Sequence, residues 1–220
     1  MSFDLAFAWS ILPRILSTFG TTLGITIAGC IGAVALGFLW ETLRRSHKVG
    51  RFSMRFLIDF IRSTPILVQV YFLYFVLPEY GITLPALVIG LLALSIYYSG
   101  YLAEVFKAGI DSIPAGQFEA ARSLGLSRIQ LILLIVLPQM LRHIAAPMGN
   151  YFVSLLKATP YLAIIAVPEM LSIALEVASD TFRYTEPMAV VGFVFLSLAL
   201  CFSALVKAIE ARLRLSPKAG

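Results

Sequence analysis

The stretch Ile15–Trp40, ILSTFGTTLGITIAGCIGAVALGFLW, decides the fold because none of its 26 residues is charged. A helix needs about 20 apolar residues to cross the core of a bilayer. The whole chain has the same character: 60% of its 220 residues are hydrophobic, 13% are charged, and the mean hydropathy is +0.91. An average soluble domain is about 45–50% apolar and about 25% charged. We therefore expect this protein to reside in a membrane.

Four further apolar runs follow the first, and none of them alternates with polar residues as the strands of a membrane barrel would. Because every backbone group in lipid must find a partner within the protein, such runs predict spanning helices. We predict five spans, at about residues 15–40, 56–77, 80–103, 143–168 and 187–206. The fourth should be interrupted, since it contains Lys157 and Pro160. The predicted fold class is an all-α membrane protein, formed by one domain over residues 1–220.

Basic residues predict the orientation of these spans, because cytoplasmic loops carry an excess of Lys and Arg. The loops after the first and third spans and the tail hold Arg44, Arg45, Lys48, Arg51, Arg55, Lys107, Arg122, Arg128, Arg142, Lys207, Arg212, Arg214 and Lys218. The opposite side holds only Arg14 and Arg183, against Asp4, Glu79, Glu176, Asp180 and Glu186. We expect the N-terminus outside the cell and the C-terminus in the cytoplasm. The formal charge of +5 then reflects topology and does not indicate a nucleic-acid partner.

The remaining residues argue against catalytic and metal chemistry. Cys30 and Cys201 lie inside apolar runs, so we expect no disulfide. His47 and His143 are isolated, whereas a metal site needs clustered ligands. The sequence has no G-x-x-x-x-G-K-[ST] phosphate loop. We expect a transport subunit that is not an enzyme and holds no cofactor; if ATP drives transport, another chain binds it.

The loop after the third span predicts a short helix over about residues 114–124. Pro114 is tolerated in the first turn of a helix, and Gly125 suits a left-handed C-terminal cap. Ser127 with Gln130 three residues later resembles the capping box of a following helix. We expect that second helix to end near Pro138.

One face of the predicted loop helix is apolar, because Ala115, Phe118 and Ala121 recur at three-residue spacing. Such a face can insert into a groove of a partner, with Glu119 and Arg122 pairing at the surface. The alternative is a loop helix that packs on its own bundle and carries a Glu119–Arg122 ion pair. We favour docking, because the basic residues independently place this loop in the cytoplasm.

Motifs extend over nearly the whole chain. They are Gly20-Thr21-Thr22-Leu23, Arg62-Ser63-Thr64-Pro65, Val68-Gln69, Tyr101-Leu102-Ala103-Glu104, Ala108-Gly109-Ile110, Ile113-Pro114, Glu119-Ala120-Ala121-Arg122, Leu124-Gly125, Leu137-Pro138-Gln139, Ser154-Leu155-Leu156-Lys157 and Val167-Pro168-Glu169. Together they resemble the permease subunits of polar amino acid ABC importers, the group with histidine, arginine, glutamine, glutamate, opine and ectoine systems.

This resemblance implies two permeases and two ATP-binding subunits in a bacterial cytoplasmic membrane, fed by an external solute-binding protein. ATP and Mg²⁺ would be held by the partner ATPase. The loop helix between the third and fourth spans would be the coupling helix that inserts into the ATPase. Its contact residues would be Phe118, Glu119, Ala120, Ala121, Arg122 and Gly125.

Ionisable residues inside the membrane are candidates for function. Asp59 and Arg62 lie three residues apart, so we predict a structural or gating pair, with Asp59 as the one clear buried acid. Lys157 could bind a substrate carboxylate or hold backbone carbonyls that Pro160 leaves free, and we favour the structural role.

Four polar residues near mid-bilayer, Gln69, Tyr97, Tyr98 and Thr159, join Lys157 as a candidate substrate pathway. The alternative is that they only form hydrogen bonds between helices. Relatives that hold an amino acid resemble Leu-Ser-Leu-Asn before Ser-Gly, and Lys-Asp-Thr in the fourth span, where this chain has Tyr97 and Ala158. Either the substrate is not a simple amino acid or a paired permease carries the pocket. Tyr97 and Tyr98 could instead face a cation through their rings.

Small residues recur at four-residue spacing in the first span, at Gly20, Gly24, Ala28 and Gly32. Such a stripe lets helices approach closely, and we favour packing within the chain over contact with a second permease.

The function we expect is the ATP-coupled import of a small polar amino acid or related zwitterion. One alternative is a self-sufficient secondary transporter or channel that ATP does not drive. Such proteins often carry inverted repeats and several intramembrane acids, neither of which is visible in this sequence. A membrane scaffold without transport activity is the other alternative.

Overall fold

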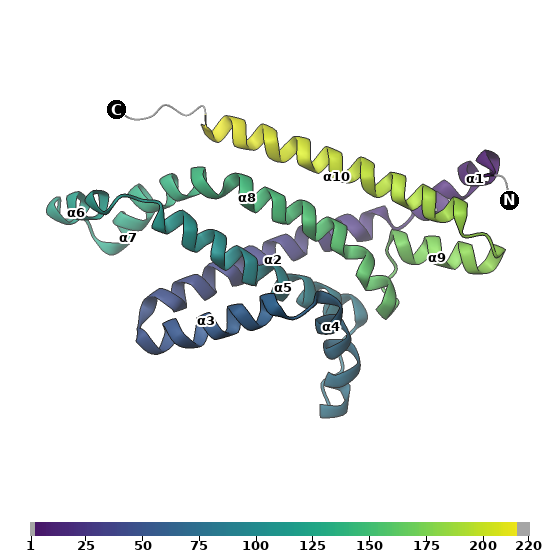
Figure 1. Cartoon of the computed structure of the whole chain (residues 1–220), viewed down its shortest axis with the longest axis horizontal. Coiled ribbons are helices and arrows are strands. Elements are labelled where there is room, and N and C mark those ends of the chain that lie inside the picture. Colours follow the sequence, from purple (N-terminus) through teal and green to yellow (C-terminus); the bar gives the residue numbers. More distant parts are fainter. Residues whose placement is uncertain (1–2, 215–220) are drawn as a thin grey trace.

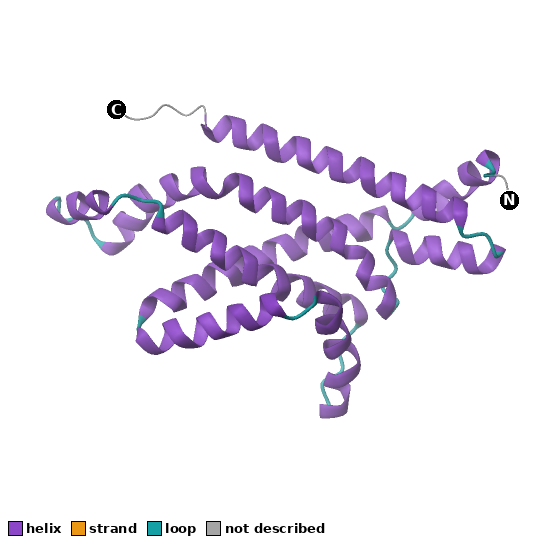
Figure 2. Ribbon diagram, in the orientation of Figure 1, coloured by secondary structure: helices purple, strands orange, loops and turns teal. Residues whose placement is uncertain are grey.

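The structure is a computed structural model that describes residues 3–214; Lys218 of the basic tail lies outside them. The described chain is helical, without a strand (Figure 2). Its α-helices are α1 (Leu5–Leu16), α2 (Phe19–Ser46), α3 (Lys48–Ser63), α4 (Ile66–Tyr71), α5 (Ala86–Asp111), α6 (Ala115–Ser123), α7 (Arg128–Gln130), α8 (Leu137–Ala158), α9 (Met170–Thr181) and α10 (Thr185–Arg214). π-helical and 3-10 turns occupy residues 72–80, 131–136 and 159–165. The predicted all-α fold class is confirmed.

The long helices run along the long axis of the molecule (Figure 1). α2, α5, α10 and the continuous segment Arg128–Ile165 are each long and apolar enough to cross a membrane. α2 and α5 form the most extensive contact between helices, while α8 packs against α5 and α10. α6 and α7 lie at one end of the molecule, and α1 and α9 lie at the opposite end (Figure 1). These two ends are the places where a membrane protein of this shape meets water.

The span predicted at 56–77 is not a single straight helix, because α3 and the segment that follows it to Tyr80 meet at 101°. Pro65 disfavours a helical conformation in the residue before it, and Thr64 is extended (φ −94°, ψ 127°). Gln69 Nε2 donates hydrogen bonds to the carbonyl oxygens of Ile61 (2.8 Å) and Thr64 (3.3 Å). The Gln69 side chain thus satisfies backbone groups that the break would leave unpaired.

The other predicted spans are present with different ends. The third continues as α5 to Asp111, beyond the predicted 80–103. The fourth already begins at Arg128, and its helix continues past Pro138. The expected helix end at Pro138 is wrong because Pro138 occupies the first turn of α8, which tolerates proline. The predicted interruption is confirmed, since α8 gives way to a 3-10 turn after Ala158.

Two helices of 12 residues each, α1 and α9, are not among the predicted spans because they are too short to cross a bilayer. α1 begins where Asp4 accepts a hydrogen bond from the Phe7 N–H (3.0 Å). α9 begins with a capping box between Glu169 and Ser172. Both helices contact α10 and share an apolar cluster with it that comprises Ile11, Ile15, Met170, Ala174, Val177 and Val191.

The stripe predicted as a packing seam consists of Gly20, Gly24, Ala28 and Gly32. Its first three residues are exposed, and a Cβ on Gly20 or Gly24 would meet nothing within 4 Å. α2 instead packs on α5 through a neighbouring face, on which a Cβ at Gly37 would lie 2.9 Å from the Ser99 carbonyl oxygen. The prediction is therefore wrong for all but Gly32, because periodicity alone does not reveal which face of a helix has a neighbour.

Candidate functional site

The loop predicted to be helical forms α6 and reverses direction at a glycine. Gly125 has a left-handed backbone conformation (φ +70°), and its N–H donates to the Arg122 carbonyl at 3.0 Å. The Leu126 N–H reaches the Ala121 carbonyl at 3.1 Å, which completes the turn. The capping box between Ser127 and Gln130 is present and starts the next helix. The sequence therefore predicted this helix–turn–helix correctly in its local structure.

The two faces of α6 are arranged differently from the expectation. Ala121 is buried (3% exposed), and Phe118 is half-buried against the main core. Phe118 and Ala121 therefore pack on their own chain, with α6 against the π-helical turn 131–136, whereas Ala115, the third residue of the predicted apolar face, is exposed. Glu119, Ala120 and Arg122 are exposed, and Leu124 is 79% exposed. These residues form the exposed surface of α6 and of the residue that follows it. Within the described chain, Glu119 and Arg122 form no ion pair with each other.

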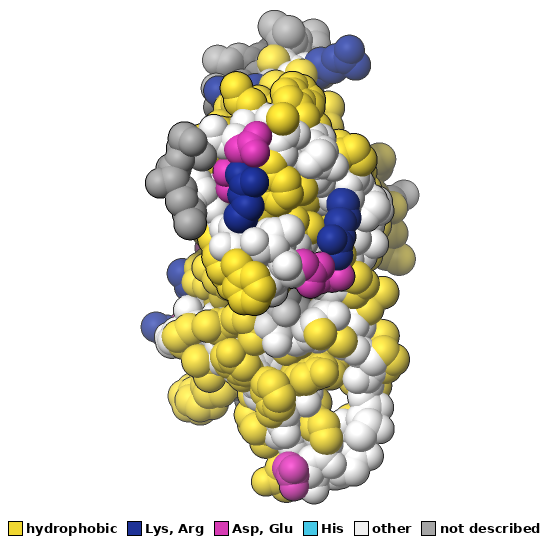
Figure 3. All heavy atoms as spheres, turned by 90° about the vertical axis from the view of Figure 1, so that its right-hand side faces the viewer, with side chains coloured by type: hydrophobic (Ala, Val, Ile, Leu, Met, Phe, Trp, Pro, Cys, Tyr) yellow, Lys and Arg dark blue, Asp and Glu magenta, His cyan; other side chains and the backbone are white. Residues whose placement is uncertain are grey.

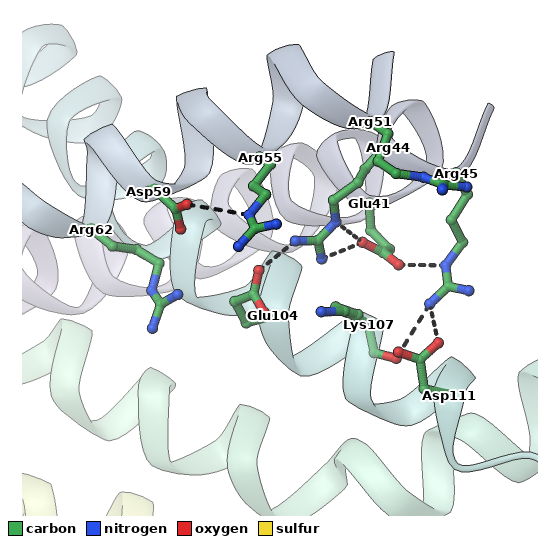
Figure 4. A pocket seen from close by; sticks show the side chains of 10 residues that line it. All are labelled: Glu41, Arg44, Arg45, Arg51, Arg55, Asp59, Arg62, Glu104, Lys107 and Asp111. Atoms are coloured by element: carbon green, nitrogen blue, oxygen red, sulfur yellow. Dashed lines mark hydrogen bonds and ion pairs between the residues drawn. The ribbon is translucent and has the colours of Figure 1, made fainter. Parts of the chain in front are cut away.

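A charged cleft of about 580 Å³ lies near the same end of the molecule, between α2, α3 and the last turns of α5 (Figure 4). It is lined by Glu41, Arg44, Arg45, Arg51, Arg55, Asp59, Arg62, Glu104, Lys107 and Asp111. These side chains come from segments up to 70 residues apart and point toward one another across the cleft (Figure 4). Positive charges outnumber negative ones in this cleft.

The floor of this cleft is a buried ion network centred on Glu41, whose side chain is 1% exposed. Its carboxylate accepts hydrogen bonds from Arg44 (2.6 Å) and from Arg45. Arg44 also pairs with Glu104, and Arg45 pairs with Asp111 at 2.6 Å. The network ties the end of α2 to the end of α5 and satisfies a carboxylate that would be costly to bury alone.

The predicted Asp59–Arg62 pair is wrong. Asp59 is exposed and faces Arg55, one turn earlier on α3, at 3.9 Å. The Arg62 guanidinium lies over the ring of Tyr101, 5.3 Å from its centroid, in a cation–π contact. The expectation failed because a residue on a helix has neighbours at both i−4 and i+3, and spacing does not choose between them.

The structure does not gather the predicted pathway residues in one pocket. Thr159 is fully buried, and its hydroxyl donates to the Leu156 carbonyl at 2.9 Å. Gln69 donates to the Ile61 carbonyl at the break between α3 and α4. Tyr97 and Tyr98 lie edge to face on α5, 5.2 Å between centroids, and the Tyr97 hydroxyl lies 3.2 Å from that of Tyr101. Both side chains therefore satisfy nearby backbone carbonyls: Gln69 bonds across the break between α3 and α4, and Thr159 bonds a carbonyl three residues before it. Neither forms the hydrogen bond between separate spans that the alternative predicted.

Tyr151 of α8 extends this tyrosine cluster, because its ring lies 5.4 Å from that of Tyr101. Sequence reasoning missed Tyr151 and the role of Tyr101. The four-residue spacing of Tyr97 and Tyr101 was the available signal for a shared face.

Lys157 is exposed at the end of α8 and makes no hydrogen bond or ion pair with any described residue. The favoured structural role, in which Lys157 holds carbonyls freed by Pro160, is not the arrangement found. A basic side chain with no partner in its own chain remains available to a ligand or to another subunit.

Sequence reasoning named Asp59, which is exposed, as the buried acid, whereas the acids buried in the described chain are Glu41, Glu169 and Glu186. Glu169 is 0% exposed; one carboxylate oxygen accepts from the Ser172 N–H (2.7 Å), and the other has no partner in the described chain. The signal for Glu169 was a polar residue that follows Pro168 and precedes an apolar helix, as capping residues do.

The opposite end of the molecule carries charged side chains on a largely hydrophobic surface (Figure 3), and they form two sets of ion pairs. Arg14 pairs with Glu176 (2.8 Å) and Asp180 (3.2 Å). Arg183 pairs with Glu186 (2.5 Å) and Asp4 (3.4 Å). The hydrogen bond from the Phe7 N–H, with a further contribution from Arg183, lowers the pKa of Asp4, and the bond to Glu186 raises the pKa of Arg183. These pairs join α1 to the residues around the α9–α10 turn.

Comparison with known proteins identifies the chain. The family described as binding-protein-dependent transport system inner membrane component matches residues 33–215. The chain belongs to this family. It is 42% identical to a probable amino-acid ABC transporter permease protein of Sinorhizobium fredii, over 99% of this chain and 93% of the relative. It is 29% identical to a glutamine transport system permease protein of Escherichia coli, over 98% and 100% of the two chains.

Solved structures agree with this assignment. A chain from the crystal structure of an amino acid ABC transporter with histidines superposes with a TM-score of 0.88 and 31% identity, covering 96% of this permease and 100% of that chain. A chain of the MetNI methionine ABC transporter shares the fold at a TM-score of 0.73 and 17% identity, over 96% and 99%. The resemblance drawn from the motifs is confirmed. This permease is a multi-pass inner-membrane subunit whose family works with separate ATPase subunits and a binding protein.

Proposed function

We propose that this permease imports an amino acid or a related zwitterion, driven by ATP hydrolysis in two partner subunits and supplied by an external binding protein. The proposal is supported by the names of relatives that match almost the entire chain, and by the structural match to an amino acid ABC transporter. A second permease, identical or paralogous, completes the proposed complex.

The orientation we propose places the N-terminus outside the cell and the α6 end in the cytoplasm. The α6 end carries the basic cleft and most Lys and Arg residues of the chain, as cytoplasmic loops do. At the other end, the two arginines Arg14 and Arg183 face four carboxylates.

The coupling element in this proposal is α6, and the observation that carries it is the contrast between its two faces. Ala121 and Phe118 anchor α6 to the π-helical turn 131–136 of its own chain, so a displacement of α6 displaces the start of α8. Glu119, Ala120, Arg122 and Gly125 remain exposed for the ATPase. ATP shifts the transporter between outward and inward states only if the ATP-bound partner binds those states with different affinity.

The test reverses charge on the exposed face of α6. Glu119→Lys and Gly125→Asp should abolish uptake and ATPase co-purification while leaving membrane insertion intact. Gly125→Asp also strains the turn, because φ +70° favours glycine. Glu79→Lys is the matched control, since Glu79 is exposed on a turn far from α6 and carries no described partner. Normal ATPase association in both α6 variants would refute the coupling role.

The route of the substrate is a separate proposal, in which the tyrosine cluster lines the path. Tyr97→Ala and Tyr98→Ala should alter the Michaelis constant for uptake, because the two rings touch edge to face and belong to the tyrosine cluster. Unchanged uptake kinetics in both variants would remove these tyrosines from the pathway and would favour a pocket carried by the second permease. Uptake by this chain alone, in liposomes without ATP, would contradict ATP coupling.

A further inference from the structure

Three cations in the cleft have no carboxylate partner. Arg51, Arg62 and Lys107 line the cleft, and none of their side chains forms an ion pair with a described residue. All three are exposed, and Arg62 has only its contact with the Tyr101 ring. The cleft as a whole has six cations against four carboxylates, so it carries an excess of two positive charges. An anion with two charges, or two anions with one each, would neutralise it.

The helix that supplies most of these cations has a second exposed face made of aromatic residues. Arg51, Arg55, Asp59 and Arg62 follow one another at three- or four-residue spacing along α3 and face the cleft. Phe52, Phe56 and Phe60 follow at the same spacing and are 77%, 69% and 59% exposed. One residue is about 100° around a helix axis, so the aromatic row flanks the basic row. A helix with these two faces is typical of the membrane interface.

We propose that this cleft binds the phosphate group of an anionic phospholipid from the adjacent leaflet. Arg side chains bind phosphate oxygens through two parallel hydrogen bonds, and a Lys ammonium binds them as a point charge. Basic pockets between spanning helices on the cytoplasmic side are suited to phospholipid head groups. The phosphate contacts Arg51 and Lys107, whereas Arg62 lies 11 residues further along α3, about 16 Å from Arg51, and adds to the positive charge of the cleft. The acyl chains lie along Phe52 and Phe56.

A soluble phosphate could use the same cations, and the aromatic row favours the lipid. Water-exposed phenylalanines cost free energy, whereas acyl chains bury them. A soluble phosphate has no acyl chains, so its binding would not involve the side chains of Phe52 and Phe56. The proposal rests on the membrane location of the permease and on the orientation proposed above, and not on the identity of its transported substrate, so it can fail without affecting the proposed transport activity.

The experiment measures retained lipid on the intact transporter complex. The complex is placed in nanodiscs of phosphatidylcholine mixed with phosphatidylglycerol, and native mass spectrometry reports the phosphatidylglycerol that stays bound. The test variant is Arg51→Gln with Lys107→Gln, which removes two cleft charges without breaking an ion pair. The matched control is Arg142→Gln with Lys207→Gln, which removes two exposed charges elsewhere.

We expect the cleft variant to bind phosphatidylglycerol about 25-fold more weakly, at about fivefold for each cation removed, and the control to change less than about twofold. Unchanged ATPase association and thermal midpoint in both variants establish that the cleft variant is folded. Equal lipid retention by the two variants would overturn the proposal.

Two further arms separate the sources of phosphate. Phe52→Ser with Phe56→Ser should weaken lipid retention, and inorganic phosphate at millimolar concentration should fail to displace the lipid. If inorganic phosphate displaces it and the aromatic variant retains it fully, the lipid assignment is refuted and a site for soluble phosphate takes its place.

Discussion

The two ends of this permease hold charges of the same kinds in different surroundings. At the α6 end, Glu41 is 1% exposed and sits between Arg44 and Arg45, which link it to α5. At the other end, Arg14 and its partner Glu176 are about half exposed, at 47% and 55%. Charges out of water cost free energy unless fully paired, while exposed pairs contribute little. The ion pairs of Glu41 therefore hold helices together, whereas the Arg14 pairs at the other end contribute little to stability.

The largest expected effect follows removal of the buried acid. Glu41→Ala should lower the free energy of unfolding by about 3–5 kcal/mol, because it leaves Arg44 and Arg45 without their shared partner. Thermal unfolding of the purified complex in detergent measures the change. Glu176→Ala is the control at the other end and should cost no more than about 1 kcal/mol. Equal losses in these two variants would contradict the comparison.

The second effect concerns an ion pair that is only partly buried. Arg183 donates to Glu186, whose side chain is 5% exposed, and its guanidinium lies 4.1 Å from the centroid of the Phe7 ring. Arg183→Ala should lower the thermal midpoint of the purified complex by less than Glu41→Ala does, because it leaves Glu186 without its charged donor and removes the stacking on Phe7. Arg183→Lys should recover part of the loss, since it restores charge without the planar contact. Full recovery by lysine would show that the ring contact contributes nothing.

How far the sequence determines these features depends on the distance between the residues involved. The Gly125 turn and the Ser127–Gln130 capping box involve neighbours within a few residues, and both were predicted. The Arg44–Glu104 pair joins residues 60 apart, and nothing local indicates which carboxylate Arg44 meets. Likewise, the spacing of Phe118 and Ala121 predicted an apolar face but not that the chain's own π-helical turn would cover it.

The same limit explains the failures inside the membrane. Pro65 lies in an apolar run that looks continuous, and hydropathy does not register the 101° bend beside it. Helices α1 and α9 are too short to cross a bilayer, so a search for long apolar runs does not find them. Asp4 and Glu169 nevertheless cap them by local rules. The sequence therefore predicts the fold class, the helix caps and the turns, while the contacts that side chains make across the bundle are visible only in the structure.

The third effect should be small. Arg14 reaches both Glu176 and Asp180, and Arg14→Gln should lower the thermal midpoint by less than Arg183→Ala does, because solvent screens all three groups. Raising the salt concentration should reduce the difference between wild type and variant further. A loss as large as that of Glu41→Ala that persists in high salt would contradict the comparison between the two ends.

The smallest effect is a dependence on pH at Asp4. Its pKa is lowered in the folded chain, chiefly by the Phe7 N–H and then by Arg183, so its contribution is present above the ordinary carboxyl range and disappears as pH falls through the lowered value. Asp4→Asn keeps the helix cap and removes the charge, whereas Asp4→Ala removes both. The thermal midpoint of wild type should lie slightly above that of Asp4→Asn, and the midpoint of Asp4→Asn should lie above that of Asp4→Ala. These differences should be the same at pH 7 and at pH 5. The gap between wild type and Asp4→Asn should narrow below about pH 4, where the unfolded chain takes up the proton, and should close once the pH falls below the lowered pKa of Asp4 in the folded chain. A gap that closes between pH 7 and 5 would mean that the pKa of Asp4 is raised in the folded chain. That result would contradict the stabilisation of its charged form by the Phe7 N–H and Arg183.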